Sequence, residues 1–268
     1  MRLRLGDLDV DLRALRDLSI PVRFDDDDGR AFHLPPATSA PVQAGSFVGD
    51  VRRGGSCNCE THTLTPHADG THTEGPGHLL GPRSAVVVPD PVCAALLIRV
   101  EPRLLGDSVD DVAGNHRHDD LVIDRQLIED AVDALALAAF APLGLVIASA
   151  AGDLRRRQRH SGRNPPYLTP DAATWVRERG FVHLLVDLPS VDRQDDGGLL
   201  AAHRAFFDLP PGPLTDFAAA ASPRTVTELI AVDDDIAAGA YALFLQVAPF
   251  VADAAPSRAL IAPFEGLA

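Results

Sequence analysis

The chain has 268 residues, 46% of them hydrophobic, so it can bury a substantial core. Its net charge of -14 argues against nucleic acid or an anionic membrane as a partner, because both would repel it at long range. The sequence contains no lysine, which excludes a lysine Schiff base or a lysine general base. No Gly/Ser/Pro-rich linker interrupts it, so we expect one domain over residues 1–268, with residues 1–40 as its N-terminal extension.

Cellular location follows from the N-terminus and the cysteines. Asp7 precedes any apolar run and no apolar stretch reaches 18 residues, so we expect a cytoplasmic protein. Cys57, Cys59 and Cys93 cannot all pair, and a chain of this size needs no disulfide scaffold. We expect reduced thiols, and the spacing of Cys57 and Cys59 does not match a structural zinc site.

The segment from Pro66 to His78 combines three histidines and a glutamate with glycines and prolines that argue against a helix. His72 and Glu74 are two residues apart, so an extended backbone points both side chains to one face. Regular alternation would send His67 to the opposite face, but Asp69-Gly70 is a turn or bulge signal that can bring it back. These are the ligand types of a borderline divalent cation, and a histidine that is not a ligand could move protons. The alternative is a polar loop with incidental histidines.

The middle of the chain predicts strands and one helix. Two short apolar clusters, Ala85–Val88 and Ala94–Ile98, predict strands separated by a turn at Pro89-Asp90-Pro91. Residues 124–140 carry apolar side chains at helical spacing among acids and predict a helix. A strand is expected at Gly144–Ala148.

The next elements indicate an α/β layer. Thr169-Pro170 marks the start of a helix that ends at Gly180, and a buried strand is expected immediately afterwards at Phe181–Asp187. Two more strands are predicted at Thr225–Ile230 and Tyr241–Val247.

A metal site needs ligands from more than one segment, so distant partners are required. His203 lies in a predicted helix over residues 199–207, where the alternative is a packed core histidine. Glu228 interrupts an apolar strand, and burying its carboxylate is costly unless it is paired or bound to a cation. Asp187 ends a buried strand, where carboxylates of α/β sheets commonly meet ligands, or it caps the following turn. Asp192 follows in the same loop.

Other chemistries find less support. Gly54–Asn58 lacks the closing glycine of a nucleophile elbow, and no phosphate-binding glycine loop is present. Ser190 could be a nucleophile, but no motif surrounds it and a turn hydroxyl is the favoured interpretation. The run Arg155–Arg159 predicts a solvated face, or beside a site it could attract an anionic substrate.

The histidine-rich segment resembles a known family. The pattern of His67, Gly70-Thr71-His72, Glu74, Pro76 and His78 is similar to the His-x-Gly-Thr-His-x-Asp-x-Pro-x-His signature of the cyclase family of metal-dependent hydrolases, which includes bacterial kynurenine formamidase and isatin hydrolase. One extra residue separates His67 from Gly70, and Glu74 replaces the aspartate, as in a branch with His-x-x-Gly-Thr-His-Thr-Glu. Supporting segments extend the resemblance over residues 40–262; they are residues 164–168, 183–192, 248–250 and 255–258.

The resemblance implies an α/β fold: a compact domain with a central β-barrel-like mixed sheet flanked by helices, assembled as a homodimer or homotetramer. It implies one or two divalent ions, zinc or manganese, and the expected ligands are His67, His72, Glu74, His203 and Glu228. His78 matches the family's catalytic histidine. The longer Glu74 side chain can change whether its carboxylate bridges two ions. We add Asp187, Ser190 and Asp192 as residues that would support the ligands or contact the substrate.

The leading functional hypothesis is hydrolysis of a C–N bond in a small amide, lactam or formamide, as in arylformamidases and isatin hydrolases. A bound divalent ion would lower the pKa of its water and polarise the carbonyl, while His78 moves the proton to the leaving atom. Two alternatives stay open. One is a metal-dependent lactonase, dehydratase or cyclase of a secondary-metabolite pathway, and the other is a metal-stabilised binding protein without turnover.

Overall fold

A closed barrel of seven strands forms the centre of the protein in a computed structural model that describes residues 2–24, 30–80, 85–112, 114–137, 141–150, 152–212 and 223–266. Around the barrel the order is β16 (Gly239–Val247), β9 (Val92–Arg99), β12 (Gly144–Ala148), β14 (His183–Val186), β15 (Thr225–Glu228), β8 (His72–Glu74) and β17 (Ala254–Pro263), and β17 pairs with β16 to close it. Strands β9, β12, β14 and β15 run parallel, and the other pairings are antiparallel. The barrel is therefore mixed.

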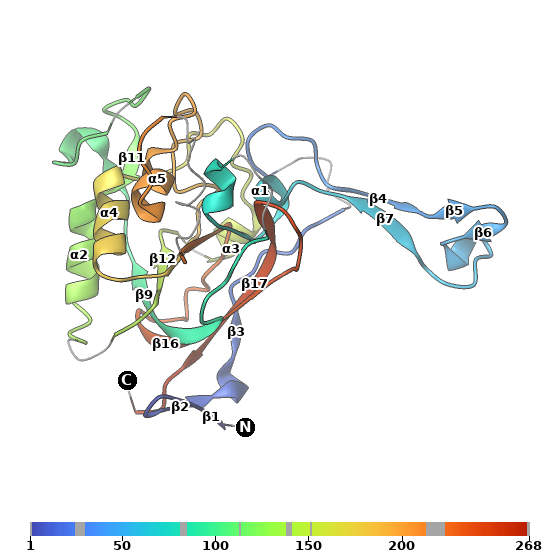
Figure 1. Ribbon diagram of the computed structural model, residues 1–268, viewed down its shortest axis with the longest axis horizontal. Helices are drawn as coiled ribbons and strands as arrows, with labels where there is room; N and C mark the ends of the chain where they lie inside the picture. Colours follow the sequence, from blue (N-terminus) through green and yellow to red (C-terminus); the bar gives the residue numbers. More distant parts are fainter. Residues whose placement is uncertain are drawn as a thin grey trace.

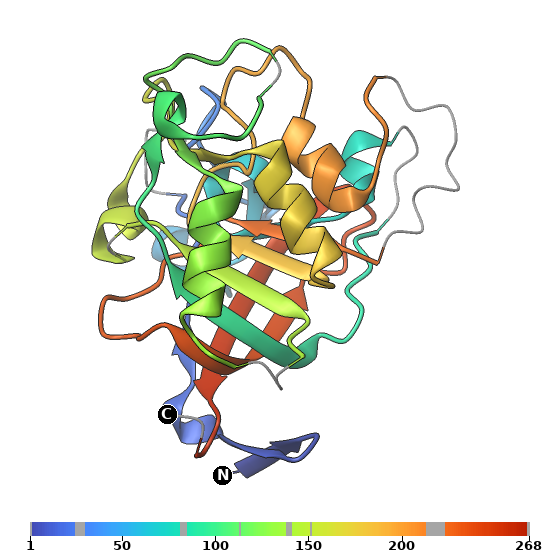
Figure 2. The same cartoon turned by 90° about the vertical axis from the view of Figure 1, so that its left-hand side faces the viewer.

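Side-chain alternation gives the barrel wall two apolar faces. Inward-facing residues such as Leu97, Val146 and Leu185 form one buried cluster, whereas their neighbours Leu96 and Leu145 belong to a second cluster outside the wall. Helices α2 (Arg125–Asp133), α4 (Pro170–Glu178) and α5 (Ala201–Phe207) cover this outer cluster (Figure 2). The strands are buried on both faces, which explains their almost continuous apolar sequences.

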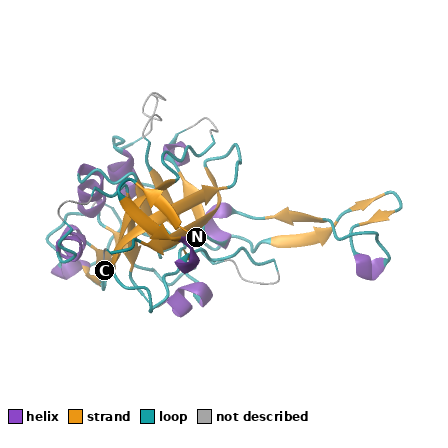
Figure 3. Ribbon diagram, turned by 90° about the horizontal axis from the view of Figure 1, so that it is seen from below, coloured by secondary structure: helices purple, strands orange, loops and turns teal. Residues whose placement is uncertain are grey.

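A long two-stranded ribbon projects from the barrel. Strands β4 (Thr38–Pro41) and β7 (Glu60–Thr63) form its stem, and β5 (Gln43–Ala44), β6 (Phe47–Val48) and the 3-10 helix Val51–Arg53 form its tip (Figures 1 and 3). By contrast, β3 (Arg16–Asp17) pairs with β17 of the main sheet. The projecting part of the chain is thus residues 38–63, whereas part of the expected extension over residues 1–40 joins the sheet.

The smaller elements lie around the barrel. They are the hairpin β1 (Arg2–Leu5) and β2 (Leu8–Asp11) with the 3-10 helix Leu12–Ala14, the sheet β10 (Arg103–Leu104), β11 (Leu121–Ile123) and β13 (Tyr167–Leu168) with the 3-10 helix Leu105–Asp107, and helix α3 (Gly152–Arg157).

Most predicted elements are present. The strands expected at Ala94–Ile98, Gly144–Ala148, Phe181–Asp187, Thr225–Ile230 and Tyr241–Val247 correspond to β9, β12, β14, β15 and β16. Helix α4 begins at Pro170 because the Thr169 hydroxyl accepts a hydrogen bond from the Ala172 N–H. The predicted helix over residues 199–207 is α5.

Three local predictions are wrong in detail. Ala85–Val88 is not a strand; these residues are partly exposed and precede Pro89, which cannot donate a ladder hydrogen bond. Helix α2 ends at Asp133 instead of continuing to residue 140, because Ala136 adopts a φ of 51°, and residues 138–140 lie outside the described chain. The histidine-rich segment contains two single helical turns, Pro66–Asp69 and Pro76–Leu79, since each proline occupies a first-turn position.

Within the described ranges, no helix has the length and apolar character that crossing a membrane requires. Cys57, Cys59 and Cys93 are free thiols, as expected.

Candidate metal centre

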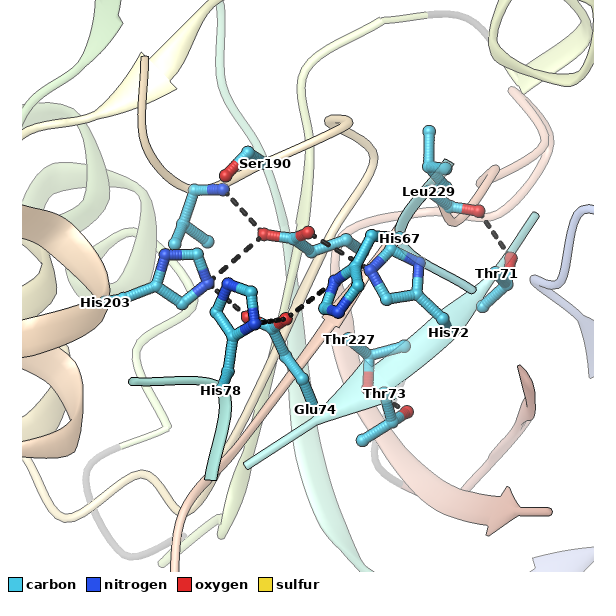
Figure 4. A network of polar contacts seen from close by, with 12 residues as sticks. His67, Thr71, His72, Thr73, Glu74, His78, Ser190, His203, Thr227 and Leu229 are labelled. Atoms are coloured by element: carbon cyan, nitrogen blue, oxygen red, sulfur yellow. Dashed lines mark hydrogen bonds and ion pairs between the residues drawn. The ribbon is translucent and has the colours of Figure 1, made fainter. Parts of the chain in front are cut away.

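Strand pairing brings two predicted ligands face to face. His72 and Glu74 lie on β8 with their side chains on one face, while Thr73 points to the other face and contacts Thr227. β8 pairs antiparallel with β15 in a register that puts His72 directly opposite Glu228. The distance from His72 Nε2 to Glu228 Oε2 is 3.3 Å, and the side chains of His72, Glu74 and Glu228 are buried. Figure 4 shows His72 and Glu74 beside the other histidines of the site.

Helix α5 adds His203 from the outer layer. Asp192 accepts hydrogen bonds from the backbone N–H groups of Ala202 and His203, so it fixes the first turn of the helix. The same carboxylate lies 2.5 Å from His203 Nδ1 and directs the other ring nitrogen, Nε2, toward Glu74 Oε1. Glu228 Oε1 lies 3.6 Å from that nitrogen and also accepts a hydrogen bond from the Val191 N–H.

Two short helical turns supply the remaining histidines. Helix α1 (Pro66–Asp69) places His67 Nδ1 3.1 Å from Glu74 Oε2, and the 3-10 turn Pro76–Leu79 places His78 Nδ1 3.7 Å from the same oxygen. His67, His78, His203 and Glu228 line a cavity of about 260 Å³. The other lining residues are Phe32, Ser190, Asp192, Arg193, Gln194, Asp196 and Leu200.

The charges of the cluster are strongly coupled in the metal-free protein. Burial alone lowers the pKa of His67, but the Glu74 and Asp253 carboxylates outweigh it and raise this pKa to about 9. Burial likewise opposes the charge on His203, yet Glu74 and Asp192 hold the His203 pKa well above its usual value. The positive histidines in turn hold the Glu74 pKa well below its usual range, although burial acts in the opposite direction. The carboxylates therefore favour a positive charge at this position.

Two buried atoms without hydrogen-bond partners among the described residues indicate that the positive charge in this cluster can be a metal cation. The Nδ1 of His72 donates to the Gly70 carbonyl oxygen at 3.0 Å, so in the neutral ring Nε2 carries the lone pair and faces the oxygen of Glu228. Neither His72 Nε2 nor Glu74 Oε2 has a hydrogen-bond partner within the described part of the chain. Ligands at about 2.1 Å from a tetrahedral or octahedral cation lie about 3.0 to 3.4 Å apart, which matches the 3.3 Å between His72 and Glu228. Among the residues that the structure describes, two groups have the donor atoms and spacing to hold a metal ion, namely His72–Glu74–Glu228 and His67–Glu74–His78.

The structure does not bring Asp187 to this cluster. Its carboxylate accepts hydrogen bonds from the Ser149 and Ala150 N–H groups and pairs with Arg155 at 3.2 Å. Arg155 is therefore buried, in contrast to the solvated face expected for residues 155–159. Ser190 lines the cavity, and its hydroxyl oxygen accepts a hydrogen bond from the Asp192 N–H.

Asp253 and several cavity-lining residues were not predicted from the sequence; the latter are Phe32, Arg193, Gln194, Asp196 and Leu200. Asp253, in the loop before β17, has Oδ2 3.0 Å from His67 Nε2 and 3.2 Å from His78 Nδ1. Phe32 lines the cavity with a φ of 58°. The signal for Asp253 was its position just before the Ala255–Arg258 segment, which already supported the family resemblance, whereas nothing in the sequence around Phe32 indicates the cavity.

Comparison with known proteins identifies the fold and the family of the chain. The chain has the fold of isatin hydrolase A from Ralstonia solanacearum (TM-score 0.58, 15% identity, 92% of each chain covered) and from Labrenzia aggregata (TM-score 0.57, 15% identity, 93% of this chain and 94% of that chain covered). A predicted metal-dependent hydrolase from Bacillus stearothermophilus gives a TM-score of 0.56 at 16% identity, with 94% and 98% of the two chains covered. No curated protein sequence matches. The family model described as "Putative cyclase" matches residues 16–193, and the chain belongs to this family.

Proposed function

We propose that the protein hydrolyses a C–N bond in a small amide, lactam or formamide with the help of a divalent metal. The observation that carries the proposal is that His72 Nε2 and Glu228 Oε2 face each other at 3.3 Å. In the neutral ring both atoms present lone pairs, and this contact is favourable only when a cation or an added proton lies between them. The proposed ligands are His67, His72, Glu74, His203 and Glu228. The two oxygens of Glu74 face different histidines, and Glu74 belongs to both candidate ligand groups, so we propose one or two ions of zinc or manganese.

The ion, when bound, supplies a Lewis acid and a water of lowered pKa. His78 lies beside Glu74 on the cavity wall, where it can take a proton from the attacking water and give it to the leaving nitrogen as the C–N bond breaks. Asp192 holds the His203 ring, and Glu228 is fixed by the Val191 N–H, so both side chains are oriented before substrate binds. A cavity of about 260 Å³ suits a small substrate.

A turnover assay tests this proposal. Protein loaded with zinc or manganese is incubated with formanilides, isatin and lactones, and its metal content is measured by elemental analysis. We expect hydrolysis of a C–N substrate by the loaded protein and none by the metal-free protein. Full activity without metal would contradict the proposal. Turnover of lactones alone would favour the second candidate, a lactonase, dehydratase or cyclase, and metal uptake without turnover would favour a binding protein.

We also propose that the protein is a homodimer or homotetramer in the cytoplasm. The stem of the projecting ribbon supports self-association, because all four residues of β7 are exposed and an isolated two-stranded ribbon is only marginally stable in water. The free Cys57 and Cys59 on this ribbon suit a reducing compartment. Light scattering of the intact protein is expected to give a multiple of 28.4 kDa, and a monomer would contradict the assembly.

A further inference from the structure

One carboxylate oxygen contacts both a proposed metal ligand and the proposed proton carrier. Asp253 lies in the loop that enters β17, and its side chain is 46% exposed. Its Oδ2 is 3.0 Å from His67 Nε2 and 3.2 Å from His78 Nδ1. The two rings lie 4.5 Å apart between centroids, so this oxygen bridges them at one end.

For His67, the contact selects which nitrogen can bind a metal. A carboxylate accepts hydrogen bonds and does not donate them, so Nε2 carries the hydrogen that faces Asp253. The opposite nitrogen, Nδ1, lies 3.1 Å from Glu74 Oε2, where it carries a proton in the metal-free protein and is the atom that would bind a metal ion in place of that proton. This arrangement is the one by which carboxylates orient metal-binding histidines.

For His78, the contact with Asp253 selects the nitrogen that can move a proton. Its Nδ1–H donates to Asp253, which leaves Nε2 with the lone pair. His78 lines the cavity, so the lone pair belongs to a ring that a substrate can reach.

His67 needs such support because of its place in the chain. It lies on a single helical turn, five positions before His72, so the strand β8 does not fix its direction. Asp253 reaches it from the loop before β17, the strand that pairs with β8, and thereby ties α1 to the barrel.

We propose that Asp253 is a positioning residue that fixes the ring orientation and tautomer of His67 for metal binding and of His78 for proton transfer. This inference rests on the proposed function, because it assigns Asp253 a part in the same site.

The test compares Asp253→Ala with Asp17→Asn. Asp17 is a matched control, because it also lies against β17, is similarly exposed, and contacts Arg258 instead of a histidine. Calorimetry with zinc or manganese, without substrate, is expected to show a metal affinity about 10- to 100-fold weaker in Asp253→Ala, and no such change in Asp17→Asn. At saturating metal, kcat is also expected to fall in Asp253→Ala. In a His78→Ala background, Asp253→Ala should still weaken metal binding but should lower kcat no further.

The outcomes separate this inference from the proposed function. If the wild-type protein binds metal and turns over substrate while Asp253→Ala behaves like Asp17→Asn, the positioning role is overturned and the proposed function stands. A readout independent of metal and turnover is ¹⁵N NMR of the histidine rings in the metal-free protein, at a pH where His78 is neutral. We expect the Nδ1–H tautomer of His78 in the wild type and in Asp17→Asn, and its loss in Asp253→Ala. An Nε2–H tautomer in the wild type would overturn the inference even if the protein proved not to be a hydrolase.

Discussion

Two buried carboxylates, those of Asp187 and Glu74, have opposite surroundings. Asp187 meets hydrogen-bond donors at both oxygens, from the Ser149 and Ala150 N–H groups and the Ser149 hydroxyl, and its charge is paired with Arg155. Glu74 Oε2 has no hydrogen-bond donor within the described residues, and the neighbouring His72 presents a lone pair. A carboxylate that is fully satisfied by the chain stabilises the fold, whereas the charge of one surrounded by ring nitrogens is balanced by protons on the histidines or, as we propose, by a metal ion.

The largest effect is expected from His72→Ala, which removes a ligand from the incompletely satisfied cluster. The variant should lose bound metal, and its turnover should fall to that of the metal-free protein, because the Lewis acid is lost. Elemental analysis and the turnover assay measure both quantities. A variant that keeps stoichiometric metal would show that His72 is not a ligand.

His78→Ala tests the division of roles within the cluster. Turnover is expected to fall by about 10²- to 10⁴-fold, the usual contribution of a general acid–base, while metal content stays unchanged. Parallel measurement of kcat and metal content checks this. Loss of metal from this variant would make His78 a ligand, consistent with its place in the His67–Glu74–His78 group.

Asp187→Asn tests whether the fully hydrogen-bonded carboxylate of Asp187 stabilises the fold. The substitution leaves Arg155, whose side chain is 4% exposed, without its charged partner, and breaking such a buried pair costs about 3 kcal/mol of unfolding free energy. Denaturant unfolding measures this loss. Metal affinity is expected to stay unchanged. A variant with normal stability but weakened metal binding would show that Asp187 supports the metal site.

A second carboxylate that the chain satisfies, that of Asp120, is expected to have a smaller effect on stability, which appears at acid pH. Burial raises the pKa of Asp120, but hydrogen bonds from Arg193, the Arg117 N–H and Asn164 outweigh it and lower this pKa to about 2. Because the folded pKa is below the unfolded value, the stabilisation is present above pH 4 and is lost as the pH falls toward 2, by about 2 kcal/mol. Unfolding free energies across this range are expected to vary less with pH in Asp120→Asn than in the wild type. An identical pH dependence in the two proteins would contradict this account.

The sequence predicted the part of the site that depends on local geometry. The two-residue spacing of His72 and Glu74 was sufficient to place both on one face of a strand. The apolar neighbours of Glu228 in the sequence indicated a buried carboxylate whose charge must be paired. The sequence did not show its partner, because the pairing of β8 with β15 that sets Glu228 opposite His72 depends on the tertiary fold.

Long-range contacts explain what the sequence could not predict. Asp187 and Arg155 are 32 residues apart, and their pairing turns an expected ligand-facing carboxylate into a structural one. Asp253 is 186 residues from His67 and reaches it only because β17 closes the barrel beside β8. The early end of α2 depends on the backbone of Ala136, a residue that ordinarily favours helices.

A crystal structure of the protein soaked with manganese would show whether His72, Glu74 and Glu228 bind a metal ion, since the ion can be located by its anomalous scattering. We expect an anomalous peak about 2.1 Å from His72 Nε2, with Glu74 and Glu228 among its other neighbours. A protein that leaves this cluster empty under saturating metal, or binds the ion elsewhere on its surface, would contradict the proposed metal site.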